Sequence, residues 1–235
     1  MNQPPPRNWQ QQPPGWPQQQ PQGWHQPPGW GPPPRKNKAP LVVGIIAGVL
    51  VLGGVIAAGA VHLNVNADGG SPKRPDKLPS ACGNVSEAAL AKARTTNPNG
   101  LGSRESKIGD DTSTICSWNQ TKGVDGKGHR STDVYVNNDL DDAQSDFDRR
   151  VAQHMDTRGV PQQKPLDGLG DQAVAVLVEG DSAFTDIWII ARKGGTMIQV
   201  DYSGWDAGLF TNTKPDVAEF EAAAKGIAEE MVAKA

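Results

Sequence analysis

The chain has 235 residues, a formal net charge of −3 and a mean hydropathy of −0.54. Its charge is unevenly distributed: residues 1–62 carry four basic and no acidic side chains, whereas the remainder carries 19 basic and 26 acidic ones. Nucleic acids are bound mainly through lysine and arginine contacts to phosphates, so the acidic C-terminal part argues against nucleic acid as a partner.

The first 34 residues are of low complexity, with 12 prolines, 9 glutamines and 4 tryptophans. An imperfect proline-glycine-tryptophan repeat ends at Trp16, Trp24 and Trp30. This composition offers too little apolar surface to offset the entropy of ordering, so we expect residues 1–38 to form a disordered tail. Two roles stay open for it: a solvated extension, or a ligand for an aromatic-lined groove of a cytoplasmic partner.

Residues 41–61 form an uninterrupted apolar run without a charge, a hydroxyl or an amide. At about 1.5 Å per residue the run is roughly 30 Å long, which matches the hydrocarbon core of a bilayer and predicts a transmembrane helix over 39–63. Arg35, Lys36 and Lys38 precede it, so we expect the tail in the cytoplasm and all that follows outside. A cleaved signal peptide is the alternative, although its apolar region is usually shorter.

Small residues recur within this run. Gly44 and Gly48 form a G-x-x-x-G pair, a spacing that lets helices approach closely and predicts a weak homodimer through the helix. Membrane helices are rich in glycine in any case, so a monomeric anchor is the alternative. The basic flank at 35–38 is expected to meet anionic lipid headgroups of the bilayer.

The rest of the chain divides into a linker and one domain. Residues 64–80 are rich in glycine, proline, asparagine and charge, which predicts a linker that lifts the domain off the membrane. Residues 81–235 suit a single extracytoplasmic domain. Cys82 and Cys116 are the only cysteines, and in an oxidising compartment an isolated pair predicts a disulfide. Zinc ligands or a free nucleophile are the alternatives, without C-x-x-C or suitably spaced histidines to support them.

Hydrophobic periodicity predicts three helices and five strands in this domain. The expected helices cover 84–95, 141–157 and 216–234. The expected strands cover 112–119, 131–137, 172–178, 183–192 and 196–203. Strands clustered between flanking helices favour an α+β fold, an antiparallel sheet with helices packed on one face.

Short motifs add a resemblance to this layout. They are Cys82 ahead of a short helix, Cys116-Ser117-Trp118, Gly168-Leu169-Gly170-Asp171 before a strand, and the terminal amphipathic helix. Together they resemble an actinobacterial envelope family catalogued as domain of unknown function 3558, and the layout is similar to exported lipoproteins and sensor domains with a PsbP-like sandwich. The resemblance covers most of 81–235 and implies an extracytoplasmic, non-enzymatic domain. Members are commonly lipoproteins, whereas this chain has a predicted spanning helix and a Pro/Gln/Trp-rich tail.

Candidate chemistry in the domain is weak. Ser117, His129 and Asp133 can be written as a catalytic triad, but no oxyanion hole and no G-x-S-x-G turn accompany them. The aspartates within 139–148 invite a calcium site, but they lack the EF-hand glycine and suit the start of a helix. We therefore predict no enzyme, no catalytic residues, no metal and no cofactor.

Two further groups of residues have alternative interpretations. Gly168, Gly170 and Asp171 precede a strand rather than opening a helix, which predicts a tight turn and not a phosphate loop. Three aromatic residues lie on adjacent predicted strands or just beyond one: Trp188, Tyr202 and Trp205. They are either core residues or the lining of an apolar ligand cleft.

The leading hypothesis is a single-pass membrane protein with a cytoplasmic N-terminus and an extracytoplasmic domain. That domain binds a small apolar ligand or an envelope protein, and the tail is available to a cytoplasmic partner. A scaffolding envelope protein without a small ligand is the alternative, and a hydrolase comes third.

Overall fold

The computed structural model describes residues 39–235 except 110 and 158, and for residues 39–48 and Ile108 it describes the backbone only. The chain divides into two compact units, Met1–Ala47 and Gly48–Ala235, and the fold below belongs to the second. Helix α1 is Ala39–Val65. No helix among the described residues is long and apolar enough to cross a membrane. The predicted tail over 1–38, and the predicted helix contact through Gly44 and Gly48, lie outside the described residues and side chains.

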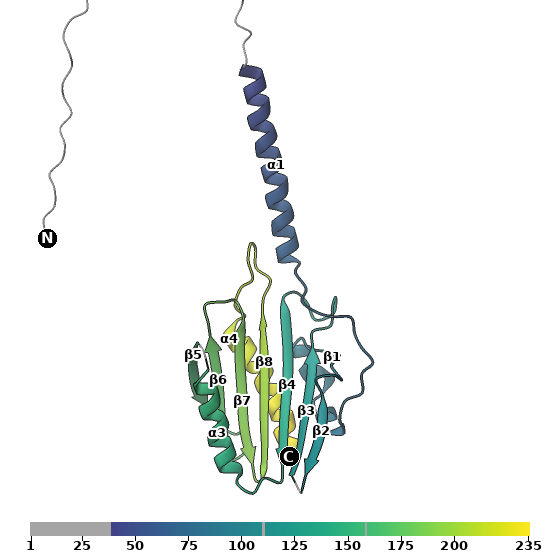
Figure 1. The fold of residues 1–235 in the computed structure, drawn as a ribbon, viewed down its shortest axis with the longest axis vertical. Coiled ribbons are helices and arrows are strands. Elements are labelled where there is room, and N and C mark those ends of the chain that lie inside the picture. The colour runs from purple at the N-terminus through teal and green to yellow at the C-terminus, as the bar shows by residue number, and fades with distance from the viewer. Residues whose placement is uncertain (1–38, 110, 158) are drawn as a thin grey trace, which may run out of the picture. The chain divides into compact units, whose positions relative to one another are not determined.

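Among the described residues, eight strands form one antiparallel sheet (Figure 1). The order along the sheet is β1-β3-β4-β8-β7-β6-β5, and β2 also pairs with β3. The strands are Asn97–Pro98 (β1), Arg104–Ile108 (β2), Asp111–Asn119 (β3), His129–Asn138 (β4), Val160–Pro165 (β5), Gln172–Glu179 (β6), Thr185–Lys193 (β7) and Thr196–Trp205 (β8). The five predicted strands are confirmed as β3, β4, β6, β7 and β8, whereas β1, β2 and β5 were not predicted.

The helices lie on both faces of this sheet. The 3₁₀ helix η1 (Ser80–Asn84), α2 (Glu87–Lys92) and α4 (Val217–Lys234) lie against one face, and α3 (Ala143–Met155) lies against the other (Figure 1). The prediction that all helices pack on one face is therefore wrong for α3. The helix predicted over 84–95 is also shorter than expected, because Ser86 caps it by accepting a hydrogen bond from the Ala89 amide.

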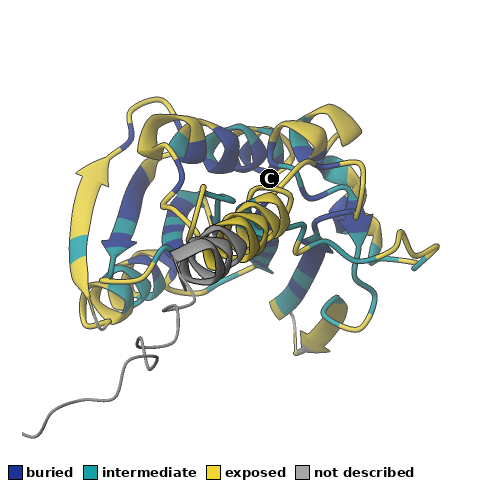
Figure 2. Cartoon of the chain, turned by 90° about the horizontal axis from the view of Figure 1, so that it is seen from above, coloured by how far each residue is buried: buried dark blue, intermediate teal, exposed yellow. Residues whose placement is uncertain are grey.

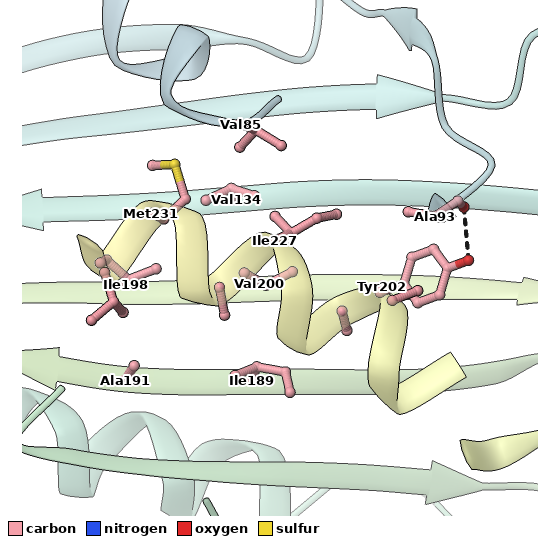
Figure 3. Close-up of a cluster of buried hydrophobic side chains, with 14 of the residues drawn as sticks. Val85, Ala93, Val134, Ile189, Ala191, Ile198, Val200, Tyr202, Ile227 and Met231 are labelled. Atoms are coloured by element: carbon pink, nitrogen blue, oxygen red, sulfur yellow. Dashed lines mark hydrogen bonds between the residues drawn. The ribbon is translucent and has the colours of Figure 1, made fainter. Parts of the chain in front are cut away.

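The larger core lies between α4 and the sheet. Helix α4 presents one apolar stripe with a spacing of three or four residues, made by Phe220, Ala224, Ile227 and Met231. Figure 3 shows Ile227 and Met231 of this stripe against side chains of β4, β7 and β8, namely Val134, Ile189, Ala191, Ile198, Val200 and Tyr202. Seen from above, the buried residues concentrate between the α4 layer and the sheet (Figure 2). This core fixes the sheet and leaves its other face free for α3.

The second core is smaller and lies under α3. Phe147 of this helix packs on Val174, Val176 and Ile190 of β6 and β7. Strand β6 is therefore buried on both faces, because its alternate residues Ala173 and Ala175 belong to the larger core. An apolar strand of this kind is typical of a sheet covered on both sides.

Cys82 and Cys116 form a disulfide, with their Cα atoms 5.5 Å apart. The bond joins η1 to the middle of β3, and both cysteines are buried. This confirms the predicted pair and leaves no free thiol in the chain.

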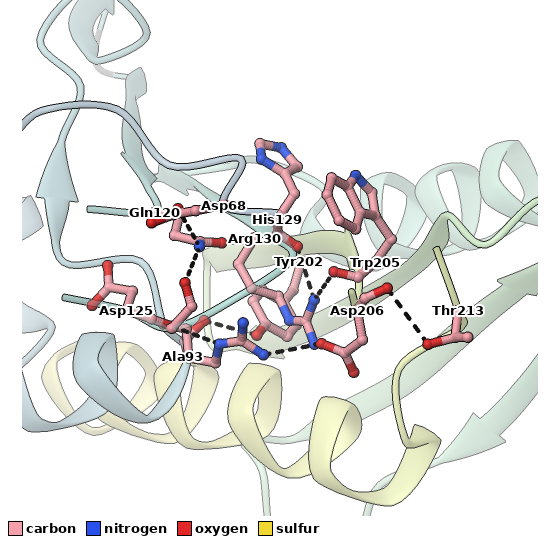
Figure 4. A network of polar contacts seen from close by, with 12 residues as sticks. Asp68, Ala93, Gln120, Asp125, His129, Arg130, Tyr202, Trp205, Asp206 and Thr213 are labelled. Atoms are coloured by element: carbon pink, nitrogen blue, oxygen red, sulfur yellow. Dashed lines mark hydrogen bonds and ion pairs between the residues drawn. The ribbon is translucent and has the colours of Figure 1, made fainter. Parts of the chain in front are cut away.

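The segment after α1 does not behave as the predicted free linker. The Gly69 amide donates to the Gly128 carbonyl at 2.7 Å, and the Gly128 amide donates to the Ala67 carbonyl at 2.8 Å. Ser71 pairs in parallel with Thr121 across a single bridge. The Asp68 carboxylate accepts a hydrogen bond from the Gln120 side chain (Figure 4) and another from the Gly123 amide. Residues 64–71 are therefore bound to the domain, and they leave no spacer between it and α1.

Candidate functional site

On the face of the sheet opposite α4, helix α3 covers β5, β6 and β7. The same face of β3, β4 and much of β8 has no helix over it (Figure 1). Strand β4 shows the consequence directly, because Arg130, Thr132, Val134 and Val136 are buried toward α4 while the residues between them are partly exposed. We call this uncovered part the open face. It consists of the partly exposed side chains of Ser131, Asp133, Tyr135, Asp201 and Ser203. Its borders are the buried Ser117 on one side, and Gln199 and Trp188 beside α3 on the other.

Strand pairing places two carboxylates side by side at the centre of the open face. Ser117 of β3, Asp133 of β4, Asp201 of β8 and Trp188 of β7 form one row across four strands. Residues directly opposite in an antiparallel pair have Cβ atoms about 4.5–5.5 Å apart, and like charges at such positions are destabilising. Among the described residues, no ion pair reaches either carboxylate.

A short hydrogen-bonded chain fixes the orientation of Asp201. Gln199 Nε2 donates to Asp201 Oδ1 at 2.7 Å, and Arg150 Nη1 of α3 donates to Gln199 Oε1 at 3.0 Å. Gln199 is only 5% exposed, so its amide is a rigid support. Arg150 therefore contacts Asp201 through Gln199 without forming an ion pair with it, and its positive charge opposes the rise in the pKa of Asp201.

The environment raises the pKa of both carboxyls. Burial raises the pKa of Asp201 from 3.8 to about 7, and the repulsion of Asp133 adds to the effect, while the hydrogen bond from Gln199 opposes it. Burial also raises the pKa of Asp133, against a hydrogen bond with Ser117. Perturbed carboxyl pairs of this kind are typical of functional sites, although structural networks produce them as well.

Aromatic side chains lie on both sides of the pair. Tyr135 follows Asp133 by two residues on β4, and its pKa is raised by burial and by the two carboxylates. Trp188 stands opposite Asp201, with its ring stacked on His154 of α3 at 4.4 Å between centroids. Burial lowers the pKa of His154, which favours a neutral imidazole near neutral pH.

This arrangement suits the binding of an organic cation. Two carboxylates that form no ion pair among the described residues attract positive charge, and aromatic faces attract ammonium and guanidinium groups through their ring quadrupoles. Among the described residues, no group of three or more His, Cys, Asp or Glu is placed to hold a metal ion.

The three aromatic residues that were expected to be either core or the lining of a cleft are not brought together. Tyr202 is 2% exposed in the α4 core, and its hydroxyl donates to the Ala93 carbonyl at 2.8 Å (Figure 3). Trp188 lies on the opposite face, packed against the α3 core. Trp205, at the end of β8, stacks with His129 at 6.3 Å between ring centroids. Tyr202 is thus a core residue, and only Trp188 takes part in the candidate site.

The other sequence candidates are also placed by the structure. Ser117 and Asp133 are neighbours, but His129 lies four residues from Asp133 at the end of β4, where its Nδ1 lies 3.3 Å from the Gly69 carbonyl. Gly168 and Gly170 have φ of 75° and 69° in the turn before β6, and Asp171 accepts a hydrogen bond from the Gly194 amide at 2.8 Å. These glycines have the conformation of a tight turn.

A second polar network, shown in Figure 4, supports the fold. Arg130 is 4% exposed and donates to the carbonyls of His129 and Trp205 and to Asp206 Oδ1. Arg94 donates to the same Asp206 oxygen at 3.0 Å and to the Asp125 carbonyl. Both arginines share the Asp206 carboxylate, and their bonds join β4 to the end of β8 and to the segment just after α2, so we assign this network to the fold.

Comparison with known proteins adds no assignment. No family model, no curated protein and no solved structure matches this chain. The resemblance to an envelope family stays a prediction.

Proposed function

We propose that this chain is a membrane-anchored, extracytoplasmic binding protein whose open face recognises a ligand with a cationic group. The observation that carries the proposal is the Asp133–Asp201 pair. Its two carboxyls stand on adjacent strands without an ion-pair partner among the described residues, and the pKa of Asp201 is raised to about 7. A ligand cation between them relieves the repulsion that the fold maintains in its absence.

The location of the domain has separate support. The buried Cys82–Cys116 disulfide is typical of an oxidising compartment outside the cytoplasm. The apolar run over 41–61, preceded by three basic residues, supports a membrane anchor with a cytoplasmic N-terminus. The resemblance to an extracytoplasmic envelope family points in the same direction. The open face would then recognise its ligand outside the membrane.

The test compares methylguanidinium with methylurea, a neutral molecule of nearly the same shape, by calorimetric titration of the full chain in detergent micelles. We expect methylguanidinium to bind at pH 8, and to bind about tenfold more weakly for each pH unit below 7, because a proton competes for Asp201. Asp201→Asn should abolish binding. Asp141→Asn, at an exposed position outside the open face, should leave it unchanged.

Two results contradict the proposal. Equal binding of methylurea would show that the ligand's charge is not recognised, and binding that survives Asp201→Asn would place the site elsewhere. If no cation binds at any pH, the alternative of a scaffolding protein without a small ligand gains support.

A further inference from the structure

Exposed apolar side chains gather at one end of the sheet. The β3–β4 loop (120–128), the β6–β7 loop (180–184) and the β8–α4 loop (206–216) meet at this end, because His129 pairs with Trp205 and Thr185 pairs with Gly204. We call it the entry end, since the chain joins the domain there through residues 64–71. The loops expose Val124, Phe184, Leu209 and Phe210, the last two with 57% and 73% of their surface accessible.

The chain ties this end closely to α1. Asn64, in the last turn of α1, donates from Nδ2 to the Gly208 carbonyl at 2.6 Å, immediately before Leu209 and Phe210. Residues 67–71 then pair with the β3–β4 loop. Gly69 permits this approach, because a Cβ there would lie 2.9 Å from the His129 side chain.

The hydrogen bond from Asn64 to Gly208 sets how far the entry end lies from the apolar run. The run ends at Val61, and three helical residues further on Asn64 has advanced about 5 Å along the axis. The polar layer on each side of a bilayer core is about 5–8 Å thick. The loop bound to Asn64 therefore lies within the polar layer whenever residues 41–61 occupy the hydrocarbon core of the bilayer.

We propose that the entry end rests on the outer surface of the bilayer, with Leu209 and Phe210 inserted among the lipid headgroups. The inference rests on the membrane anchor of the proposed function and is independent of the open face. Leucine and phenylalanine side chains lower their free energy by leaving water for this layer, as the apolar side of an interfacial helix does. Lys122 and Lys127 of the β3–β4 loop are exposed, and at this depth their positive charges would be attracted to the lipid phosphates.

The experiment uses spin labels on the full chain in vesicles of phosphatidylcholine and phosphatidylglycerol. Cysteine replaces Phe210, or Leu209 as a second position, and the ratio of collisions with oxygen and with a water-soluble nickel complex reports depth. The native cysteines are bonded to each other and buried, so they take no label. Two control labels calibrate the depth. Asp167→Cys, exposed at the opposite end of the sheet, gives the collision ratio of a label in water, and Val55→Cys gives that of a label within the apolar run.

We expect labels at 209 and 210 to collide with oxygen several times more often, relative to nickel, than the label at 167. If they match the label at 167 while the label at 55 is shielded from nickel, the inference is overturned and the anchor stands. If the label at 55 is itself open to nickel, the anchor and the inference both fail. Labels at 209 and 210 that reach neither collider would mean a protein contact in place of lipid, which also overturns the inference.

Discussion

Replacing Asp201 by asparagine should make the domain more stable at pH 8. A carboxyl whose pKa is 3.8 in the unfolded chain and about 7 in the folded chain binds its proton more tightly when folded. Between these values the folded state holds more protons, so the free energy of unfolding falls as the pH rises and levels off above pH 7. Asparagine has no such charge, and its carbonyl keeps the hydrogen bond from Gln199.

The magnitude follows from the pKa of Asp201. Each pKa unit corresponds to about 1.4 kcal/mol, so a rise to about 7 costs at most about 4 kcal/mol at high pH. Between pH 5 and pH 8 the wild-type protein should lose about 2–3 kcal/mol through this group. The burial of Asp133 raises its pKa too and adds to the loss in the same direction.

The assay is urea unfolding of the full chain in a mild detergent, followed by circular dichroism at several pH values from 5 to 8. Asp201→Asn should flatten the pH profile and match the wild type only near pH 5. Asp141→Asn, at an exposed position, should leave the wild-type slope intact. Parallel profiles for wild type and Asp201→Asn would refute the assignment of the pH dependence to this carboxyl.

Two further predictions concern stability. Replacing Cys82 and Cys116 together by alanine should lower the free energy of unfolding by up to about 4 kcal/mol, because their bond closes a loop with a sequence separation of 34. A change below about 1 kcal/mol in the urea midpoint analysis would contradict this. Asp206→Asn should cost about 3 kcal/mol, because it leaves the buried Arg130 guanidinium without its carboxylate. Asp171→Asn, which breaks an exposed ion pair, should cost less than about 1 kcal/mol in the same urea unfolding. Equal losses for the two variants would contradict the importance of burial for the Arg130–Asp206 pair.

The strands that sequence reasoning found are those with clear apolar alternation or runs. Strand β5, Val160–Pro165, was missed because two prolines and three polar residues hide it, and such strands survive only at a sheet edge. Strand β2, Arg104–Ile108, is mostly polar and pairs only with β3. Their pairing is a property of the assembled sheet, which local sequence does not specify.

The placement of α3 was misjudged although a signal was present. Residues 173–178 are continuously apolar, which is typical of a strand buried on both faces, so a second helical layer was predictable from β6 alone. An amphipathic stripe such as that of α3 reports only that one side of the helix is buried. It does not say which face of the sheet receives it.

The candidate site was only half visible in the sequence. Asp133 and Asp201 each occupy a polar position in an alternating strand, where an aspartate ordinarily faces water. Only the pairing of β4 with β8 puts them opposite each other, and only the packing of α3 buries the neighbouring Gln199. Of the aromatic candidates, Trp188 lies beside the carboxylate pair, whereas Tyr202 points to the other face and belongs to the core.

The most direct test of the central claim is the titration of the Asp201 carboxyl carbon by NMR in the full chain, with and without saturating methylguanidinium. The open face predicts a pKa of about 7 for the free protein, and a lower pKa when the cation is bound, because the cation stabilises the ionised carboxylate. An Asp201 carboxyl that titrates near 4 and does not respond to the cation would contradict both the electrostatics of the pair and the proposed recognition.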